Sequence, residues 1–246
     1  LYFRAFDEKF IEEIRSYAIN YFRKILSNLG WEPQKSDKHT DALLRTFTIS
    51  VLGKMNDDTV TDDAIRKYQK FLKSPSSLSP DLIETICSIA AWNGNSKTFA
   101  ELKKLYTNAK TMEEKLRFLG AMCGFQDKKL LVRTLNFSQT SEVRSQNMQL
   151  PIMKVAGNPY GEKVLWPWLK KNWKNINKKV GHGNPLFNRI VASIAGVADD
   201  SMENEIKVFF KNNPTPGTER TQSQTLERIR INSKFLRTMR KEFKNG

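Results

Sequence analysis

The stretch Asn158-Pro159-Tyr160-Gly161-Glu162-Lys163-Val164-Leu165-Trp166-Pro167-Trp168-Leu169-Lys170-Lys171-Asn172-Trp173 separates this chain from a generic helical sequence. An Asn-Pro pair and a glycine precede a run in which apolar residues recur every three or four positions, the spacing of a helix with one buried face. The residues expected on that face are Leu165, Trp168, Leu169 and Trp173. Trp166 lies off this stripe and is expected on another surface.

Pro167 interrupts the same run, and a proline inside a helix lacks the N–H that the helical hydrogen bond requires. We therefore expect a kink or a break in the helix at this position.

Helical spacing continues outward from this stretch over nearly the whole chain, and no alternating strand pattern exceeds a few residues. Capping residues, glycines and prolines mark the ends of the segments. The helices expected are 6–29, 43–52, 62–72, 80–93, 99–106, 111–122, 127–135, one after Thr140 or Ser141 that contains Val143, then 159–180, 185–197, 201–210 and 221–243.

About a dozen short helices with short connections pack most readily as antiparallel neighbours. The expected fold class is therefore all-α, an irregular α-solenoid of the armadillo or HEAT type without a strict repeat. The serine-rich stretch 73–79 is the most linker-like, but a loop between helices explains it equally well. We expect one domain over residues 1–246.

The composition is that of a globular protein, with 246 residues, 39% of them hydrophobic and 27% charged. Its apolar runs are too short to cross a membrane. Cys87 and Cys123 each lie in an apolar helical stretch, which favours reduced core thiols and a cytoplasmic location. The chain begins with Leu1 and not Met, so we expect a fragment or a processed product.

The formal net charge is +15, which raises the expectation of an anionic partner such as nucleic acid, an acidic membrane or an acidic protein surface. Acidic residues are interspersed along much of the chain, which favours solvated helix faces instead. We therefore expect no membrane partner, and nucleic acid remains the weaker alternative.

The sequence contains few residues in patterns typical of a catalytic or metal site. The two histidines, His39 and His182, are isolated, whereas a zinc peptidase needs two histidines one helical turn apart with a carboxylate ligand. The pairs Asp57-Asp58 and Asp62-Asp63 are better explained as helix caps than as metal ligands. We expect no catalytic residue, metal or cofactor in this chain.

Three stretches together resemble a known family, in the same order and spacing. They are Asn158-Pro159 with Gly161, Trp166, Trp168-Leu169 and Asn172-Trp173; the run Glu142-Val143-Arg144-Ser145-Gln146-Asn147; and Arg220-Thr221 with Gln224, Glu227, Ile229 and Asn232. This pattern is similar to the C-terminal helical domain of the gluzincin zinc aminopeptidases. Leu165, Asn147 and Phe235 depart from the residues usual in that family.

The resemblance implies that the catalytic residues and the zinc ion belong to a preceding domain, since its His-Glu-x-x-His motif does not occur here. It implies a helical bowl that encloses the substrate chamber and gates access to it. The partners implied are the catalytic domain and peptide substrates, whose carboxylates a basic wall would attract. The candidate substrate-binding residues are Arg144, Gln146 and Arg220.

Two other classes of function stay open at this point. A free-standing basic α-solenoid could bind nucleic acid through its phosphates, with an affinity that falls steeply with salt. A scaffold could hold a partner peptide or helix on one face.

Overall fold

The computed structural model describes residues 8–181 and 184–242, and all regular secondary structure in these residues is helical. The twelve α-helices are α2 (Glu8–Leu29), α3 (His39–Lys54), α4 (Asp58–Lys73), α5 (Pro80–Trp92), α6 (Ser96–Asn108), α7 (Met112–Ala121), α8 (Lys128–Ser138), α9 (Gln149–Ala156), α10 (Glu162–Val180), α11 (Leu186–Ser193), α12 (Glu203–Asn212) and α13 (Glu219–Glu242). The six 3₁₀ turns are η1 (Pro75–Ser77), η2 (Met122–Gly124), η3 (Ser145–Asn147), η4 (Pro159–Gly161), η5 (Ile194–Gly196) and η6 (Asp200–Met202). The predicted all-α class is confirmed. Phe6, His182 and Phe243 lie outside the described residues.

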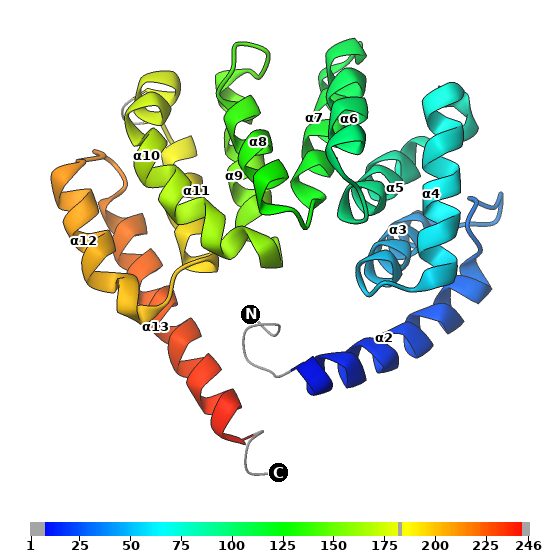
Figure 1. The fold of residues 1–246 in the computed structure, drawn as a ribbon, viewed down its shortest axis with the longest axis horizontal. Coiled ribbons are helices and arrows are strands. Elements are labelled where there is room, and N and C mark those ends of the chain that lie inside the picture. Colours follow the sequence, from blue (N-terminus) through cyan, green and yellow to red (C-terminus); the bar gives the residue numbers. More distant parts are fainter. Residues whose placement is uncertain (1–7, 182–183, 243–246) are drawn as a thin grey trace. The chain divides into compact units, whose positions relative to one another are not determined.

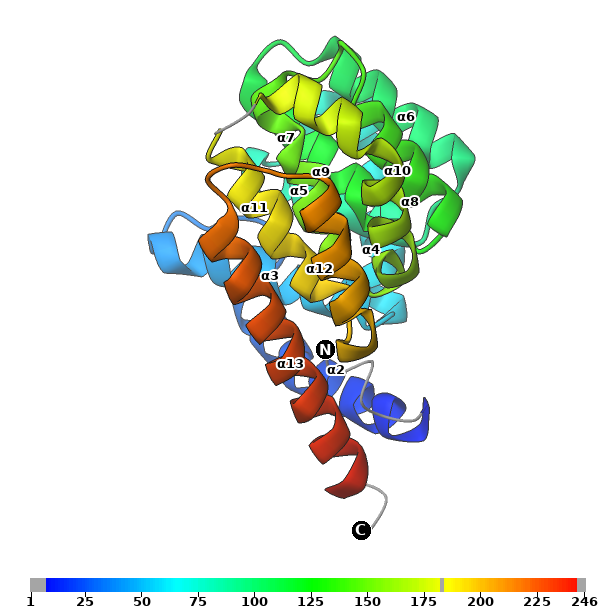
Figure 2. The ribbon, with the colours of Figure 1, turned by 90° about the vertical axis from the view of Figure 1, so that its left-hand side faces the viewer.

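The described residues form two compact units, 8–125 and 126–242. Within each unit, a helix packs on the second helix that follows it in the sequence (Figure 1). In the first unit α3 packs on α5 and α5 on α7, and in the second α9 packs on α11 and α11 on α13. Figure 2 shows α11, α12 and α13 side by side in the second unit. A single domain and a continuous superhelix stay predictions.

Local sequence signals place several helix ends as expected. Thr111 and Glu114 form a capping box at the start of α7, and the side chain of Asp127 accepts a hydrogen bond from the backbone of Lys129 at the start of α8. Gly30 ends α2 with a φ of 66°, a conformation that favours glycine. Asp57 caps α4, so this helix begins four residues earlier than predicted.

A buried arginine fixes the connection between α2 and α3. Arg45 is 1% exposed and donates to the backbone oxygens of Leu29 at 3.0 Å and Gly30 at 3.1 Å, and to the carboxylate of Asp37 at 2.6 Å. The hydrogen bond from the Gln34 backbone, aided by Arg45, holds the pKa of Asp37 below its usual value. A charged side chain therefore satisfies the carbonyls at the end of α2.

The apolar spacing that predicts helices at 6–29 and 43–52 is typical of buried faces, but in α2 and α3 these faces are buried only in part. In α2 only Leu26 is buried, and Ile14, Tyr17 and Tyr21 are exposed. In α3 the side chains of Leu43, Leu44 and Phe47 are exposed, and the core is formed by the opposite side of the helix. The apolar spacing is helical in both segments, but the described elements leave these side chains of α2 and α3 exposed.

Of the kink or break expected at Pro167, the break is wrong, because α10 continues through this residue, and the kink stays a prediction. Burial of Trp166, Trp168 and Trp173 on either side of it favours the helix more than one missing hydrogen bond disfavours it. Trp166 lies on a different side of α10 from Trp168, as expected, but both side chains are buried in the core. The indole of Trp166 donates to Glu205 at 3.2 Å, and that of Trp168 donates to Asn136 at 2.8 Å.

The helix expected after Thr140 or Ser141 does not form; residues 140–144 are a turn, and the next α-helix begins at Gln149. The ammonium group of Lys179 explains the difference. It donates to the backbone oxygens of Ser138 at 3.0 Å, Thr140 at 2.7 Å and Val143 at 2.9 Å. The ammonium group therefore satisfies these three backbone carbonyls, which would otherwise need the hydrogen bonds of a helix.

Candidate functional site

A pocket of about 1000 Å³ lies entirely within the second unit, between α9, α11 with η5, and α13. Five of its residues are small and leave the space open: Ala156, Gly157, Ala192, Ala195 and Gly196. A Cβ atom on Gly196 would lie only 3.0 Å from the backbone oxygen of Ala156, so α9 and η5 approach closely at this point. The pocket is therefore bounded by backbone on one side and by longer side chains of α13 on the other.

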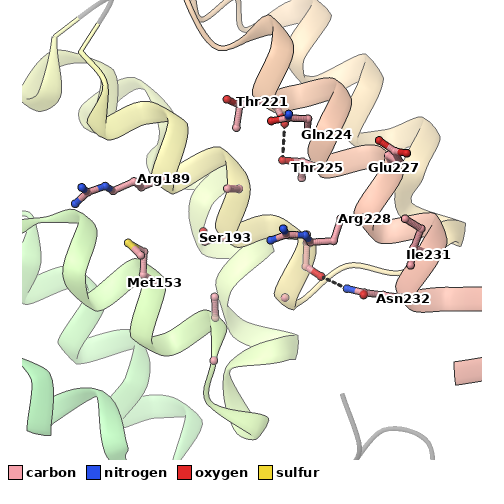
Figure 3. Close-up of a pocket in the computed structure, with 15 residues that line it drawn as sticks. Met153, Arg189, Ser193, Thr221, Gln224, Thr225, Glu227, Arg228, Ile231 and Asn232 are labelled. Carbon is pink, nitrogen blue, oxygen red and sulfur yellow. Dashed lines mark hydrogen bonds between the residues drawn. The ribbon is translucent and has the colours of Figure 1, made fainter. Parts of the chain in front are cut away.

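Hydrogen bonds hold α13 against α11 and η5 along the pocket (Figure 3). The hydroxyl of Thr225 donates to the backbone oxygen of Val191 in α11 at 3.5 Å, and the amide of Asn232 donates to the backbone oxygen of Ala195 in η5 at 3.2 Å. The hydroxyl of Thr221 contacts the side-chain oxygen of Asn188 at 2.5 Å. These contacts fix the wall from which the remaining polar side chains project.

Two arginines and one carboxylate give the pocket its charge. Arg189 comes from α11, and Arg228 and Glu227 come from α13. Arg189 donates to the side-chain oxygen of Gln149 at 3.3 Å, whereas Arg228 forms no hydrogen bond or ion pair with any residue that the structure describes. Figure 3 shows Arg228 extending from α13 toward the side on which Ser193 lies. A guanidinium group in this position is available to a carboxylate or phosphate ligand.

The candidate residues Arg144 and Gln146 lie at the exposed turn η3, outside the lining of this pocket. The backbone oxygen of Gln146 accepts a hydrogen bond of 3.3 Å from Gln149, which in turn accepts the one from Arg189. Arg220 is exposed on the first turn of α13, next to the lining residue Thr221. No described hydrogen bond joins the side chains of the three candidates to one another.

The lining residues Arg189 and Arg228 were not among those candidates. A signal for part of the site was nevertheless present in one stretch of the family resemblance, called here the last-helix pattern, which consists of Arg220, Thr221, Gln224, Glu227, Ile229 and Asn232. Of its six residues, Thr221, Gln224, Glu227 and Asn232 line the pocket, whereas Ile229 is buried and Arg220 lies outside. Positions 221, 224, 228 and 231 follow helical spacing, so the stripe could have been found from the sequence.

A smaller pocket of about 470 Å³ lies beside the turn after α8. Its lining residues are Gln139, Ser145, Asn175, Lys178 and Lys179. The ammonium group of Lys179 is already committed to three carbonyls, and its partial burial lowers its pKa. This residue therefore shapes the turn that leads to Arg144.

Within residues 8–181 and 184–242, no three His, Cys, Asp or Glu side chains lie close enough together to hold a metal ion. Cys87 and Cys123 are buried and form no disulfide, as expected for core thiols. None of the helices described here has a stretch long and apolar enough to cross a membrane.

These observations define a class: an all-helical domain that presents an arginine-bearing polar pocket on stacked helices. Residues 2–231 match the family model described as ERAP1-like C-terminal domain. The chain therefore belongs to this family, which agrees with the resemblance seen in its motifs.

Several aminopeptidases are similar to the chain over most of its length. Aminopeptidase M1-D of Oryza sativa subsp. japonica is 30% identical over 94% of this chain, and Aminopeptidase M1 of Arabidopsis thaliana is 27% identical over 96%. The mitochondrial Aminopeptidase 2 of Saccharomyces cerevisiae is 25% identical over 92%. The matched regions make up 27%, 27% and 24% of these relatives, so the chain spans about a quarter of their length.

Proposed function

We propose that the chain acts as the C-terminal domain of a zinc-dependent aminopeptidase that cleaves N-terminal residues from peptides. The match of residues 2–231 to the ERAP1-like C-terminal domain family carries this proposal. The zinc ion and the catalytic residues belong to the part of the relatives that this chain does not span. The chain has no activity by itself; it encloses the substrate chamber and gates access to it.

The pocket between α9, α11 and α13 supports a direct contact with peptide. Arg228 is exposed, charged and without a partner among the described residues, and its neighbours Gln224 and Ser193 are polar. A peptide that reaches this pocket places its C-terminal carboxylate against the guanidinium group. Arg144, Gln146 and Arg220 contribute to the same basic wall in this proposal.

The parent protein can be tested directly. Expression of the full natural reading frame should give a protein that releases 4-nitroaniline from aminoacyl-4-nitroanilides and that loses this activity when a chelator removes its metal. Activity that persists in metal-depleted protein, or no activity in the metal-loaded protein, would refute the proposed function.

The contribution of Arg228 is tested with paired peptides that end in a free carboxylate or in an amide. Loss of a hydrogen bond to a charged group is worth about 1.5–3 kcal/mol, so Arg228→Gln should raise KM about 10-fold or more for the free acid. The amide and the short nitroanilide should change little. Arg66→Gln, which alters an exposed arginine of the first unit, is the matched control.

The location proposed for the protein is the cytoplasm. Its support is the pair of buried cysteines without a disulfide, which suits a reducing compartment. Immunofluorescence of the natural protein with fractionation would test it, and recovery in the secreted fraction would contradict it.

A further inference from the structure

The smaller pocket, of about 470 Å³, lies where the C-terminal end of α10 is close to the turn after α8. The residues that line it, and that define what is called here the α10 end pocket, are Gln139, Ser145, Asn175, Lys178 and Lys179. Lys178 and Lys179 follow Asn175 by three and four positions, so the three residues share one face of α10. Every lining side chain can donate a hydrogen bond, and none of the five is acidic. The α10 end pocket is therefore suited to an anion.

Two positive charges flank the α10 end pocket without a carboxylate partner among the described residues. Lys178 is exposed, and its ammonium group forms no hydrogen bond or ion pair with any residue that the structure describes. The ammonium group of Lys179 donates to three backbone oxygens of residues 138–143, so no described carboxylate balances its charge either. Partial burial lowers the pKa of Lys179, as expected for a charge that has lost part of its hydration and has no counter-ion.

The polar side chains beside the two ammonium groups are also available to a ligand. The side chains of Gln139, Ser145 and Asn175 take part in no hydrogen bond with the described residues. They offer two amide groups and one hydroxyl in addition to the ammonium group of Lys178. The backbone oxygens of the neighbouring turn would repel an anion, but three of them accept hydrogen bonds from Lys179, which offsets their negative charge.

We propose that the α10 end pocket binds a phosphate dianion, free or as a monoester, through the ammonium group of Lys178 and hydrogen bonds from Ser145 and Asn175. Two ammonium groups balance the two charges of this ligand, and its oxygens can accept from several donors at once. A carboxylate matches less well, because it carries one charge and has two oxygens. The α10 end pocket shares no lining residue with the pocket that contains Arg228, and this proposal does not rest on the proposed function.

Isothermal titration calorimetry of the protein made from its full natural reading frame tests this proposal. The probes are inorganic phosphate and, separately, β-glycerophosphate, with acetate as the carboxylate control, all at the same ionic strength. Lys178→Met removes the ammonium group that has no partner. Lys174→Met is the matched control, because Lys174 is an exposed lysine of the same helix that does not line the pocket. Ser145→Ala is a second pocket variant that leaves the net charge unchanged.

We expect saturable binding of phosphate that weakens at least about tenfold in Lys178→Met, about threefold in Ser145→Ala and less than about twofold in Lys174→Met. Acetate should bind at least about tenfold more weakly than phosphate. Equal affinities of Lys178→Met and Lys174→Met would overturn the proposal, because phosphate would then bind to the general positive charge of the protein. Absence of saturable binding to the natural protein, or equal binding of acetate and phosphate, would also overturn it.

The two probes distinguish the sources of the phosphate group. Tighter binding of β-glycerophosphate than of inorganic phosphate would identify a monoester as the ligand, and the reverse order would identify free phosphate. Circular dichroism and the urea midpoint show whether each variant is folded, and Ser145→Ala decides if Lys178→Met is not. Phosphate affinity does not depend on hydrolysis, so a protein without aminopeptidase activity would refute the proposed function and leave this proposal standing.

Discussion

Replacement of Gly161 by alanine should strongly destabilise the second unit, because the backbone of η4 passes very close to that of α9. A Cβ atom at this position would lie 1.9 Å from the backbone oxygen of Val155 and 2.9 Å from its carbonyl carbon. The φ of Gly161 is −75°, which any residue can adopt, so the close approach alone imposes the requirement for glycine.

The magnitude follows from the displacement that the new methyl group would force. Ordinary contacts of a Cβ atom begin at 3.4 Å, so the two backbone segments would have to separate by about 1.5 Å. Overpacking against adaptable side chains costs about 1–3 kcal/mol. Here both sides are backbone, and we expect about 3–4 kcal/mol, near the upper end for a single substitution.

Gly157→Ala is the matched control, four residues earlier in the same turn. Its Cβ atom would lie 3.5 Å from the nearest atom, an ordinary contact, and its φ is −84°. Alanine reduces the entropy of the unfolded chain, so this variant should be unchanged or more stable by about 0.4–1 kcal/mol. Gly196→Ala, with a contact of 3.0 Å, should fall between the two.

Urea unfolding followed by tryptophan fluorescence measures these differences, since Trp166, Trp168 and Trp173 are buried in the second unit. With a urea dependence of about 1.5 kcal/mol per molar, Gly161→Ala should lower the midpoint by about 2 M. Equal midpoints for Gly161→Ala and Gly157→Ala would refute the close approach of η4 and α9.

Three further results are expected. Lys179→Met removes three hydrogen bonds from backbone carbonyls and should destabilise the second unit by about 2–4 kcal/mol, with faster amide exchange at residues 138–147 as the distinguishing measurement. Arg45→Met leaves the carbonyls at the end of α2 and the Asp37 carboxylate without their donor and should cost the first unit about 3 kcal/mol in urea unfolding. Hydrogen bonds from Arg230 and Lys207 lower the pKa of Glu203 from 4.5 to about 2, so its stabilising contribution is present above pH 4.5 and is lost as the pH falls toward 2. In that window the thermal midpoint of Glu203→Gln should fall less steeply than that of the natural protein, and identical slopes would contradict the assignment.

The helical class could be predicted because spacing and caps are local properties. The capping box at Thr111 and the N-cap at Asp127 follow from side chains within three residues of the backbone groups that they bind. The turn at residues 140–144 could not be predicted in this way. It depends on Lys179, which is about 40 positions away in the sequence and about 3 Å away in space.

Burial was predicted less well than helicity, because periodicity shows which side of a helix is apolar but not whether a neighbour covers it. The stripe at Ile14, Tyr17 and Tyr21 has the spacing of a core face and is nevertheless exposed. Trp166 shows the converse, since it lies off the main stripe of α10 and is buried against Phe209, with ring centroids 5.1 Å apart. A helix can have two neighbours on different sides, and a single stripe describes only one of them.

The motifs that carry the family resemblance mostly serve packing, and only one of them reaches the candidate site. Asn158 accepts a hydrogen bond from the backbone of Tyr160 at 2.9 Å, Gly161 permits the close approach to α9, and Trp173 packs against Phe209 at 5.3 Å. These contacts hold the elements of the second unit together, and Asn158, Gly161 and Trp173 do not line the pocket. The last-helix pattern differs, because four of its residues line the pocket.

Differences of ligand preference between members of this family should therefore be sought on α13 and not in the Asn-Pro-x-Gly segment. Arg228 lies on the same face of α13 as Thr221 and Gln224 and projects from a wall that hydrogen bonds to α11 and η5 hold in place. A substitution there changes the charge offered to a ligand without removing a contact that holds the helices together. A substitution of Gly161, in contrast, acts on stability first, and any change of binding follows from the displaced helices.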